Sequence, residues 1–151
     1  MASTHQQLLY HVVFSTKNRQ PFLRENAFRE HAFAYMAGTI KNLGGYALQI
    51  GGWVDHAHLL VRIPAKIAVS DFIGKVKANT SKHINESEKI SVRFAWQEGF
   101  GAFSVSPSQK NTVIRYIRDQ RDHHGRVSFE QEYVELLKRH KVEYDARFVL
   151  D

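Results

Sequence analysis

Apolar and polar positions follow two different periods along the chain, and the changes between them divide it into eight expected elements. β-Branched and aromatic residues with strand periodicity predict four strands, at about 8–16, 46–54, 57–63 and 94–106. Apolar residues spaced three and four apart predict four helices, at about 25–43, 69–85, 108–123 and 128–139. Turn residues separate these runs, with Gly44 and Gly45 after the first helix and Pro64 after the third strand.

The first six elements follow the order strand, helix, strand, strand, helix, strand. This order matches the ferredoxin-like arrangement, an α+β fold in which helices cover one face of an antiparallel sheet. Along the third strand, one face carries Ala57, Leu59, Val61 and Ile63, and the other carries His56, His58, Leu60 and Arg62. Because the apolar set is expected beneath the helices, the histidines are expected on the open face.

The composition is ordinary for one globular domain, residues 1–151, with 43% hydrophobic and 24% charged residues. No cysteine is present, which excludes disulfides, thiolate metal sites and cysteine nucleophiles. No apolar run reaches the roughly 18 residues of a membrane helix, and the first residues lack the pattern of a signal peptide. We therefore expect a cytoplasmic protein that does not use a membrane.

The formal net charge of +6 is unevenly distributed. Residues 1–127 contain 17 Lys and Arg against 9 Asp and Glu, whereas residues 128–151 contain 4 against 6. A basic body of this kind indicates a polyanionic partner, either nucleic acid or an anionic membrane surface. The candidate phosphate contacts are Lys17, Arg19, Arg62, Lys75, Lys77, Arg115 and Arg118.

Two histidines stand one residue apart in the segment "WVDHAHLLV" at 53–61. In a strand, residues i and i+2 point to the same side, so His56 and His58 direct two imidazoles at one place. This is metal-ligand spacing, although nine histidines in the chain make one such pair unremarkable by itself. The pair therefore needs a second group of residues to support it.

That second group lies in the third helix, in "NTVIRYIRDQRDHH" at 111–124. Tyr116 and Gln120 are four residues apart and therefore share one helix face. Basic residues surround them, namely Lys110, Arg115, Arg118 and Arg121. A tyrosine among arginines, on a helix able to lie against the open sheet face, is suited to nucleophilic attack on a phosphodiester.

These segments together resemble a known family. "DHAHLLV" at 55–61, "WQEGFGAFS" at 96–104 and "YIRDQ" at 116–120 are similar to the single-tyrosine HUH transposases of the smallest bacterial insertion sequences. The similarity extends over nearly the whole chain, including "FSTKNRQP", "KANTSKHIN" and "SFEQEYVELLKRHKVEYD". Two positions depart from it: Val54 stands where relatives often have proline, and Ala57 is smaller than the usual residue between the histidines.

The resemblance implies a function and a site. Tyr116 matches the catalytic tyrosine, which forms a 5′-phosphotyrosine with single-stranded DNA, and His56, His58 and Gln120 match the ligands of a divalent ion, Mg²⁺ or Mn²⁺. It further implies recognition of hairpins at the ends of the element and a homodimer in which the tyrosine helix of one subunit can complete the site of the other.

Several alternatives remain at this level. His124 lies near the same helix face as Gln120 and is a possible substitute for it as a ligand. The same chemistry also suits a replication initiator or a domesticated nuclease. A different class is a non-catalytic module that binds single-stranded nucleic acid by stacking bases on Phe100 and Phe103, since "GFGAFSV" resembles the aromatic strand of RNA-recognition modules. The competing interpretation of that segment is a glycine-kinked core strand.

Overall fold

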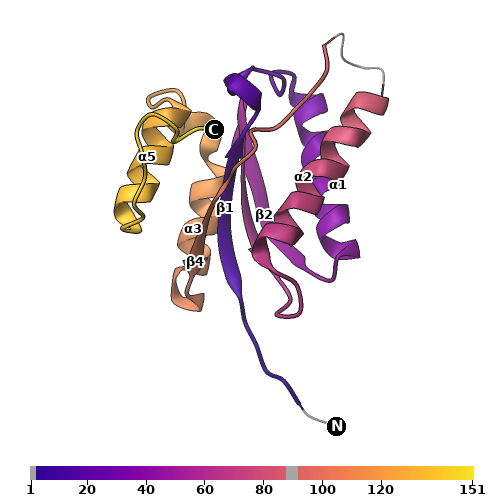
Figure 1. The fold of residues 1–151 in the computed structure, drawn as a ribbon, viewed down its shortest axis with the longest axis vertical. Helices are drawn as coiled ribbons and strands as arrows, with labels where there is room; N and C mark the ends of the chain where they lie inside the picture. Colours follow the sequence, from indigo (N-terminus) through magenta and orange to yellow (C-terminus); the bar gives the residue numbers. More distant parts are fainter. Residues whose placement is uncertain (1–2, 88–91) are drawn as a thin grey trace.

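A computed structural model describes residues 3–87 and 92–151 of the chain. Four strands, β1 (Leu9–Ser15), β2 (Tyr46–Trp53), β3 (His56–Arg62) and β4 (Gly101–Val105), form an antiparallel sheet in the order β2-β3-β1-β4. Helices α1 (Asn26–Asn42) and α2 (Val69–Glu86) cover one face (Figure 1). This topology confirms the predicted ferredoxin-like α+β fold.

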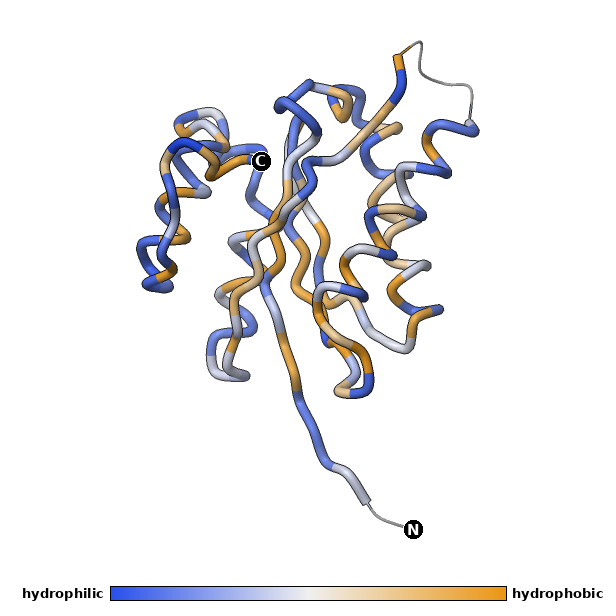
Figure 2. Tube along the Cα trace, viewed as in Figure 1, coloured by the Kyte–Doolittle hydropathy of each residue, from blue (hydrophilic) through white to orange (hydrophobic). Residues whose placement is uncertain are grey.

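The main core lies between the sheet and α1 and α2. Ala57, Leu59 and Val61 of β3 are fully buried there, as the alternation along the strand predicts. They pack with apolar side chains of the two helices, among them Met36, Ile40, Phe72 and Ile73. The strands in the middle of Figure 2 are accordingly rich in hydrophobic residues, while polar positions lie toward the outside of the helices.

The opposite face of the sheet is also covered, as expected for the tyrosine helix but not for the helix at 128–139. Helices α3 (Lys110–Arg118), α4 (Gln120–His123) and α5 (Phe129–Arg139) lie on that side (Figure 1). A second apolar cluster joins Val13 and Phe103 of the sheet to α5, whose contributors are Phe129, Tyr133, Leu136 and Leu137. The expected open face is therefore buried, because α5 carries an apolar stripe of its own.

Two predicted boundaries differ from the structure. The helix expected at 108–123 begins as a 3₁₀ turn, Pro107–Gln109, and is interrupted at Asp119, whose φ is −92° and ψ 19°. The strand expected at 94–106 is ordered as β4 only from Gly101, apart from an isolated bridge between Thr16 and Trp96. The amide of Gln97 donates to the Ser15 carbonyl of β1, but the carbonyls of residues 97–99 accept hydrogen bonds from Lys77 and not from a neighbouring strand.

The first turn of α5 is fixed by a capping box. The Ser128 side chain accepts from the backbone amide of Gln131, and the Gln131 side chain accepts from the backbone amide of Ser128. None of the described helices combines the length and apolar character that crossing a bilayer requires.

Candidate metal and tyrosine site

The two histidines of β3 lie at the centre of the covered sheet face. His56 and His58 are both 0% exposed, and they pair in register with Trp53 and Gly51 of β2. Gly51 allows α3 to approach the sheet closely, since a Cβ there would lie 3.0 Å from Cγ2 of Ile117. The absence of a side chain at Gly51 therefore positions the residue that precedes Ile117, which is Tyr116.

The other two predicted residues come from α3 and α4 and meet these histidines. Oε1 of Gln120 lies 2.9 Å from Nε2 of His56. The Gln120 amide nitrogen donates to the Tyr116 carbonyl at 3.3 Å. The structure thus brings together His56, His58, Tyr116 and Gln120, the four site residues expected from the sequence.

Glu132 of α5 stands between the predicted residues and was missed. Its Oε1 lies 2.8 Å from Nε2 of His58 and 3.6 Å from Nε2 of His56. Its Oε2 accepts a hydrogen bond from the Tyr116 hydroxyl and another, at 3.1 Å, from the side-chain amide of Gln120. One signal in the sequence could have found it, because Glu132 is an acid on the apolar stripe of α5, beside Phe129 and Leu136. In the structure Glu132 is only 3% exposed.

His124, the alternative to Gln120 in the sequence, lies in the same cluster as Gln120. Its Nε2 lies 2.9 Å from Oε1 of Gln120 and 3.0 Å from Oε1 of Glu132. Ligand atoms of His56, His58, His124 and Glu132 all lie within 4.8 Å of one another. His123 is adjacent, with Nε2 3.2 Å from Oε2 of Glu132, but this contact lacks hydrogen-bond geometry.

Outer hydrogen bonds fix which ring nitrogen faces inward. Nδ1 of His56 donates to Asp55 at 2.8 Å, and Nδ1 of His124 donates to the Val127 carbonyl at 2.7 Å. In the neutral imidazoles, Nε2 of both rings is therefore a lone-pair acceptor directed at the cluster. Histidines that bind a metal usually donate the N–H of the other ring nitrogen to a carboxylate or a backbone carbonyl, as His56 and His124 do here.

The donor set fits a divalent cation. The inward nitrogens of His56 and His124 face Oε1 of Gln120 and Oε1 of Glu132, both acceptors, at separations of 2.9–3.6 Å. Two neighbouring ligands of an ion with bonds of about 2.1–2.2 Å stand about 3 Å apart in octahedral geometry. Converging acceptors at this spacing need either protons or a cation between them, and this mixed nitrogen and oxygen set could hold a divalent metal ion.

Burial sets the protonation of the cluster. It lowers the pKa of His58 to about 4, an effect that Glu132 partly opposes, so this imidazole is neutral at pH 7 and able to ligate a metal. Burial raises the pKa of Glu132, but its close contacts with His124 and His58 outweigh this effect and hold the pKa well below its usual range. Burial and the neighbouring Glu132 carboxylate raise the pKa of Tyr116, so its phenol is protonated in this arrangement.

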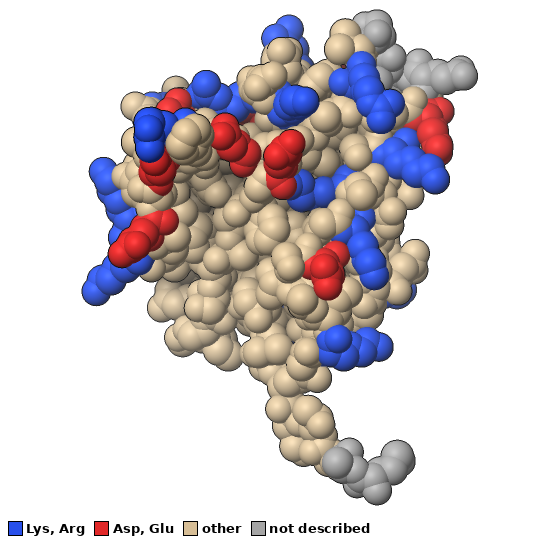
Figure 3. Space-filling view, viewed as in Figure 1, with Lys and Arg blue, Asp and Glu red and all other residues tan. Residues whose placement is uncertain are grey.

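Most of the candidate phosphate contacts are exposed. This group comprises Lys17, Arg19, Arg62, Lys75, Arg115 and Arg118. In Figure 3, Lys and Arg side chains gather on the side where α2 lies, whereas both signs of charge mix over α5. Exposure of this kind is compatible with backbone contacts to nucleic acid.

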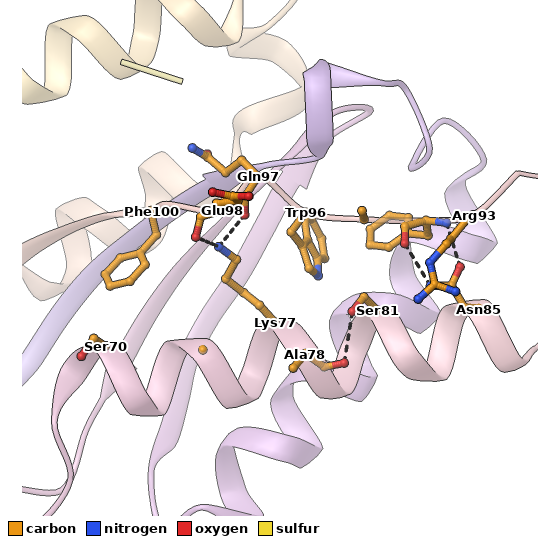
Figure 4. Close-up of a pocket in the computed structure, with 13 residues that line it drawn as sticks. Ser70, Lys77, Ala78, Ser81, Asn85, Arg93, Trp96, Gln97, Glu98 and Phe100 are labelled. Atoms are coloured by element: carbon orange, nitrogen blue, oxygen red, sulfur yellow. Dashed lines mark hydrogen bonds between the residues drawn. The ribbon is translucent and has the colours of Figure 1, made fainter. Parts of the chain in front are cut away.

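Lys77 differs from the expectation of a phosphate contact. It is 8% exposed, and Figure 4 shows its amine directed from α2 toward the segment before β4. The amine donates to the carbonyls of Gln97, Glu98 and Gly99 at 2.8, 3.2 and 2.7 Å. Burial lowers the pKa of Lys77 to about 8. Its role here is to satisfy the carbonyls that leave the sheet.

The aromatic pair required by the binding-module alternative is not an exposed platform. Phe103 is 4% exposed and stacks on His140, with ring centroids 4.3 Å apart. Phe100 packs against the main core, on the other side of the sheet. The glycine-kinked core strand is therefore the better interpretation of this segment, and base stacking on these two rings is disfavoured.

Comparisons with known proteins agree with these features. A family model described as "Transposase IS200 like" matches residues 4–120. Curated transposases for insertion sequence element IS200 from Salmonella typhimurium and Salmonella typhi are each 30% identical over 128 residues, covering 80% of this chain and 81% of theirs.

Two solved structures share the fold. A candidate transposase from Deinococcus radiodurans has a TM-score of 0.64 at 18% identity and covers 80% of this chain and 95% of its own. A REP-associated tyrosine transposase bound to a REP hairpin has a TM-score of 0.60 at 14% identity, covering 84% of this chain and 76% of its own.

Proposed function

The chain belongs to the IS200-like transposase family, and on this basis we propose that it cleaves and rejoins single-stranded DNA through Tyr116. A divalent ion, Mg²⁺ or Mn²⁺, held by His56, His58 and Gln120 would serve the reaction. The observation that supports this most directly is a shared partner: Glu132 accepts the Tyr116 hydroxyl and also lies 2.8 Å from His58. Nucleophile and metal-type donors therefore belong to one connected site.

The proposed reaction conserves the phosphodiester bond energy. The phenol oxygen of Tyr116 attacks the scissile phosphorus and loses its proton, the bond from phosphorus to the 3′ oxygen breaks, and that oxygen takes up a proton. The products are a 5′-phosphotyrosine and a free 3′-hydroxyl. Attack by the 3′-hydroxyl of another end reverses the step and restores Tyr116, so no nucleotide hydrolysis is needed.

The chain's own residues orient this attack. Gln120 hydrogen-bonds to the Tyr116 carbonyl and contacts Nε2 of His56, which supports a network that joins the proposed nucleophile to the proposed ligands. The chemistry that a bound divalent ion supplies is polarisation of the scissile phosphate as negative charge develops on it. Asp55 orients His56 from behind, through its hydrogen bond to Nδ1.

We propose DNA with hairpin ends as the substrate, and a homodimer as the working form. Support for the hairpin comes from the solved relative with a REP hairpin bound and from the exposed basic residues. A replication initiator or domesticated nuclease would share the chemistry and differ in substrate. Cleavage only of DNA with paired flanking hairpins favours the transposase, whereas equal cleavage of unrelated single strands favours a more general nuclease.

The test is formation of a covalent adduct. Purified protein is incubated with 5′- or 3′-labelled single-stranded DNA that contains the hairpins flanking its gene in the genome. The reaction contains Mn²⁺ or a chelator, and the products are resolved on a denaturing gel. We expect a metal-dependent adduct on the 5′-phosphate side of the break that Tyr116→Phe abolishes without loss of DNA binding. Tyr144→Phe, at an exposed tyrosine, is the matched control and should retain the adduct. An adduct that persists in Tyr116→Phe refutes the assignment of the nucleophile.

A further inference from the structure

We propose that Glu132 and His124 are additional ligands of the divalent ion and that Glu132 at the same time positions the Tyr116 hydroxyl, so that the segment after residue 120 completes the centre within one chain. This inference rests on the proposed function and concerns two residues beyond residue 120, where the match to the family model ends. It predicts a metal centre with five protein ligands.

The burial of Glu132 argues for a ligand. Its side chain is 1% exposed, and its carboxylate faces polar atoms of six other residues, at 2.8 Å for His58 and 3.0 Å for His124. A buried carboxylate is costly unless cations or hydrogen-bond donors compensate it. No lysine or arginine is paired with this carboxylate among the described residues. Tyr116 and Gln120 donate hydrogen bonds to Oε2. Oε1, which faces His58 and His124, needs a histidine N–H or a metal ion as its partner.

The inward nitrogens show which compensation the site is built for. Nδ1 of His124 is already bound to a backbone carbonyl, as Nδ1 of His56 is bound to Asp55. Nε2 of His56 and Nε2 of His124 each lie 2.9 Å from Oε1 of Gln120, so in the neutral rings acceptor faces acceptor. A cation at the centre would give these acceptors a common partner.

The position of α5 is well determined by the rest of the fold. The capping box at Ser128 sets its start, and Phe129, Tyr133, Leu136 and Leu137 pack it against the sheet. The chain end folds back on the same cluster through Val149 and Leu150. Glu132 therefore sits on an anchored helix, as a precise ligand requires.

The two carboxylate oxygens of Glu132 contact different groups. Oε1 faces the inward nitrogens of His58 and His124, while Oε2 accepts the Tyr116 hydroxyl. A single carboxylate thereby fixes the phenol next to the ligand cluster, in the chain that supplies the histidines. The geometry points to a site that is complete without a residue from a second subunit.

The experiment measures metal binding apart from catalysis. Mn²⁺ is titrated into full-length protein and followed by calorimetry and by electron paramagnetic resonance of the free ion. The Glu132→Gln and His124→Ala proteins are compared with Glu135→Gln, the same change at an exposed position of the same helix. We expect Glu132→Gln and His124→Ala each to weaken Mn²⁺ binding at least about tenfold, while Glu135→Gln binds like the wild type.

Thermal unfolding with and without Mn²⁺ keeps the test interpretable if a variant is less stable. The wild type should gain melting temperature with Mn²⁺, and Glu132→Gln should lose most of that gain whatever its metal-free stability. If Glu132→Gln binds Mn²⁺ with the wild-type affinity, the proposal is wrong. If that variant also cleaves DNA faster than the wild type, α5 blocks access to the site instead of contributing a ligand. Wild-type protein that binds Mn²⁺ through Glu132 but forms no DNA adduct refutes the proposed function and leaves the ligand assignment standing.

Discussion

Gly51→Ala tests whether the close approach of α3 to the sheet controls the position of Tyr116. Gly51 pairs with His58 in the sheet and faces Ile117, the neighbour of Tyr116 on α3. An added Cβ would lie 3.0 Å from Cγ2 of Ile117 and 3.2 Å from its carbonyl carbon. Backbone atoms are among those contacts, so a side-chain rotation cannot relieve them.

The size of the effect follows from these distances. Carbon atoms in favourable contact are about 3.5–4.0 Å apart, so α3 has to move away from β2 by about 0.5–1 Å. Overpacking of this kind costs about 1–3 kcal/mol of unfolding free energy. A misplacement of about 1 Å can lower a reaction rate about 100-fold, so we expect adduct formation to slow by about 10–100-fold.

The assay is single-turnover adduct formation at saturating DNA and Mn²⁺, well below the melting temperature of the variant. Gly38→Ala is the matched control, because a Cβ at this helix position meets nothing within 4 Å, and it should cleave at the wild-type rate. Mn²⁺ affinity should fall much less than the rate in Gly51→Ala, since His56 and His58 stay on β3. Wild-type cleavage by a folded Gly51→Ala protein would refute the argument that this contact sets the tyrosine.

Three further predictions follow from the same contacts. Lys77→Met should lower the free energy of unfolding by about 2–4 kcal/mol, because three carbonyls lose their donor; denaturant titration measures this, and a changed salt dependence of DNA binding with unchanged stability would instead indicate a phosphate contact. Asp55→Ala should weaken Mn²⁺ binding about 10–100-fold, because His56 loses the acceptor that orients it; calorimetry that finds full affinity would contradict this role. A mixture of His56→Ala and Tyr116→Phe proteins should form no adduct, because Glu132 connects Tyr116 to His58 within one chain; adduct formed by the mixture would mean that the tyrosine acts across subunits.

Local periodicity predicted most of the fold and part of the site. Alternation along β3 placed His56 and His58 on one side of the strand, and the four-residue spacing of Tyr116 and Gln120 placed them on one helix face. Both relations need only the geometry of one element. Local patterns failed where a residue distant in the chain determined the structure. The strand predicted before Gly101 is an example, because its carbonyls accept hydrogen bonds from Lys77.

Local sequence patterns also could not predict that α5 covers the second face of the sheet. The apolar stripe of α5 is visible in the sequence, but nothing in the local pattern says which surface it covers. Once it packs on Val13 and Phe103, the face expected to be open becomes a buried site. The polar side chains on that face then have to satisfy one another or bind an ion.

The sequence by itself determined the ferredoxin-like order of elements, the histidine pair and the tyrosine helix, because each depends on contacts between residues close together in the chain. Only the tertiary structure decided that Glu132 joins this site, since it meets His58 across a separation of 74 residues. His11 supports the outer nitrogen of His58 across 47 residues, which no local pattern encodes. A long-range meeting of this kind depends on how two separately stable surfaces pack, and that packing is decided only when the whole chain folds.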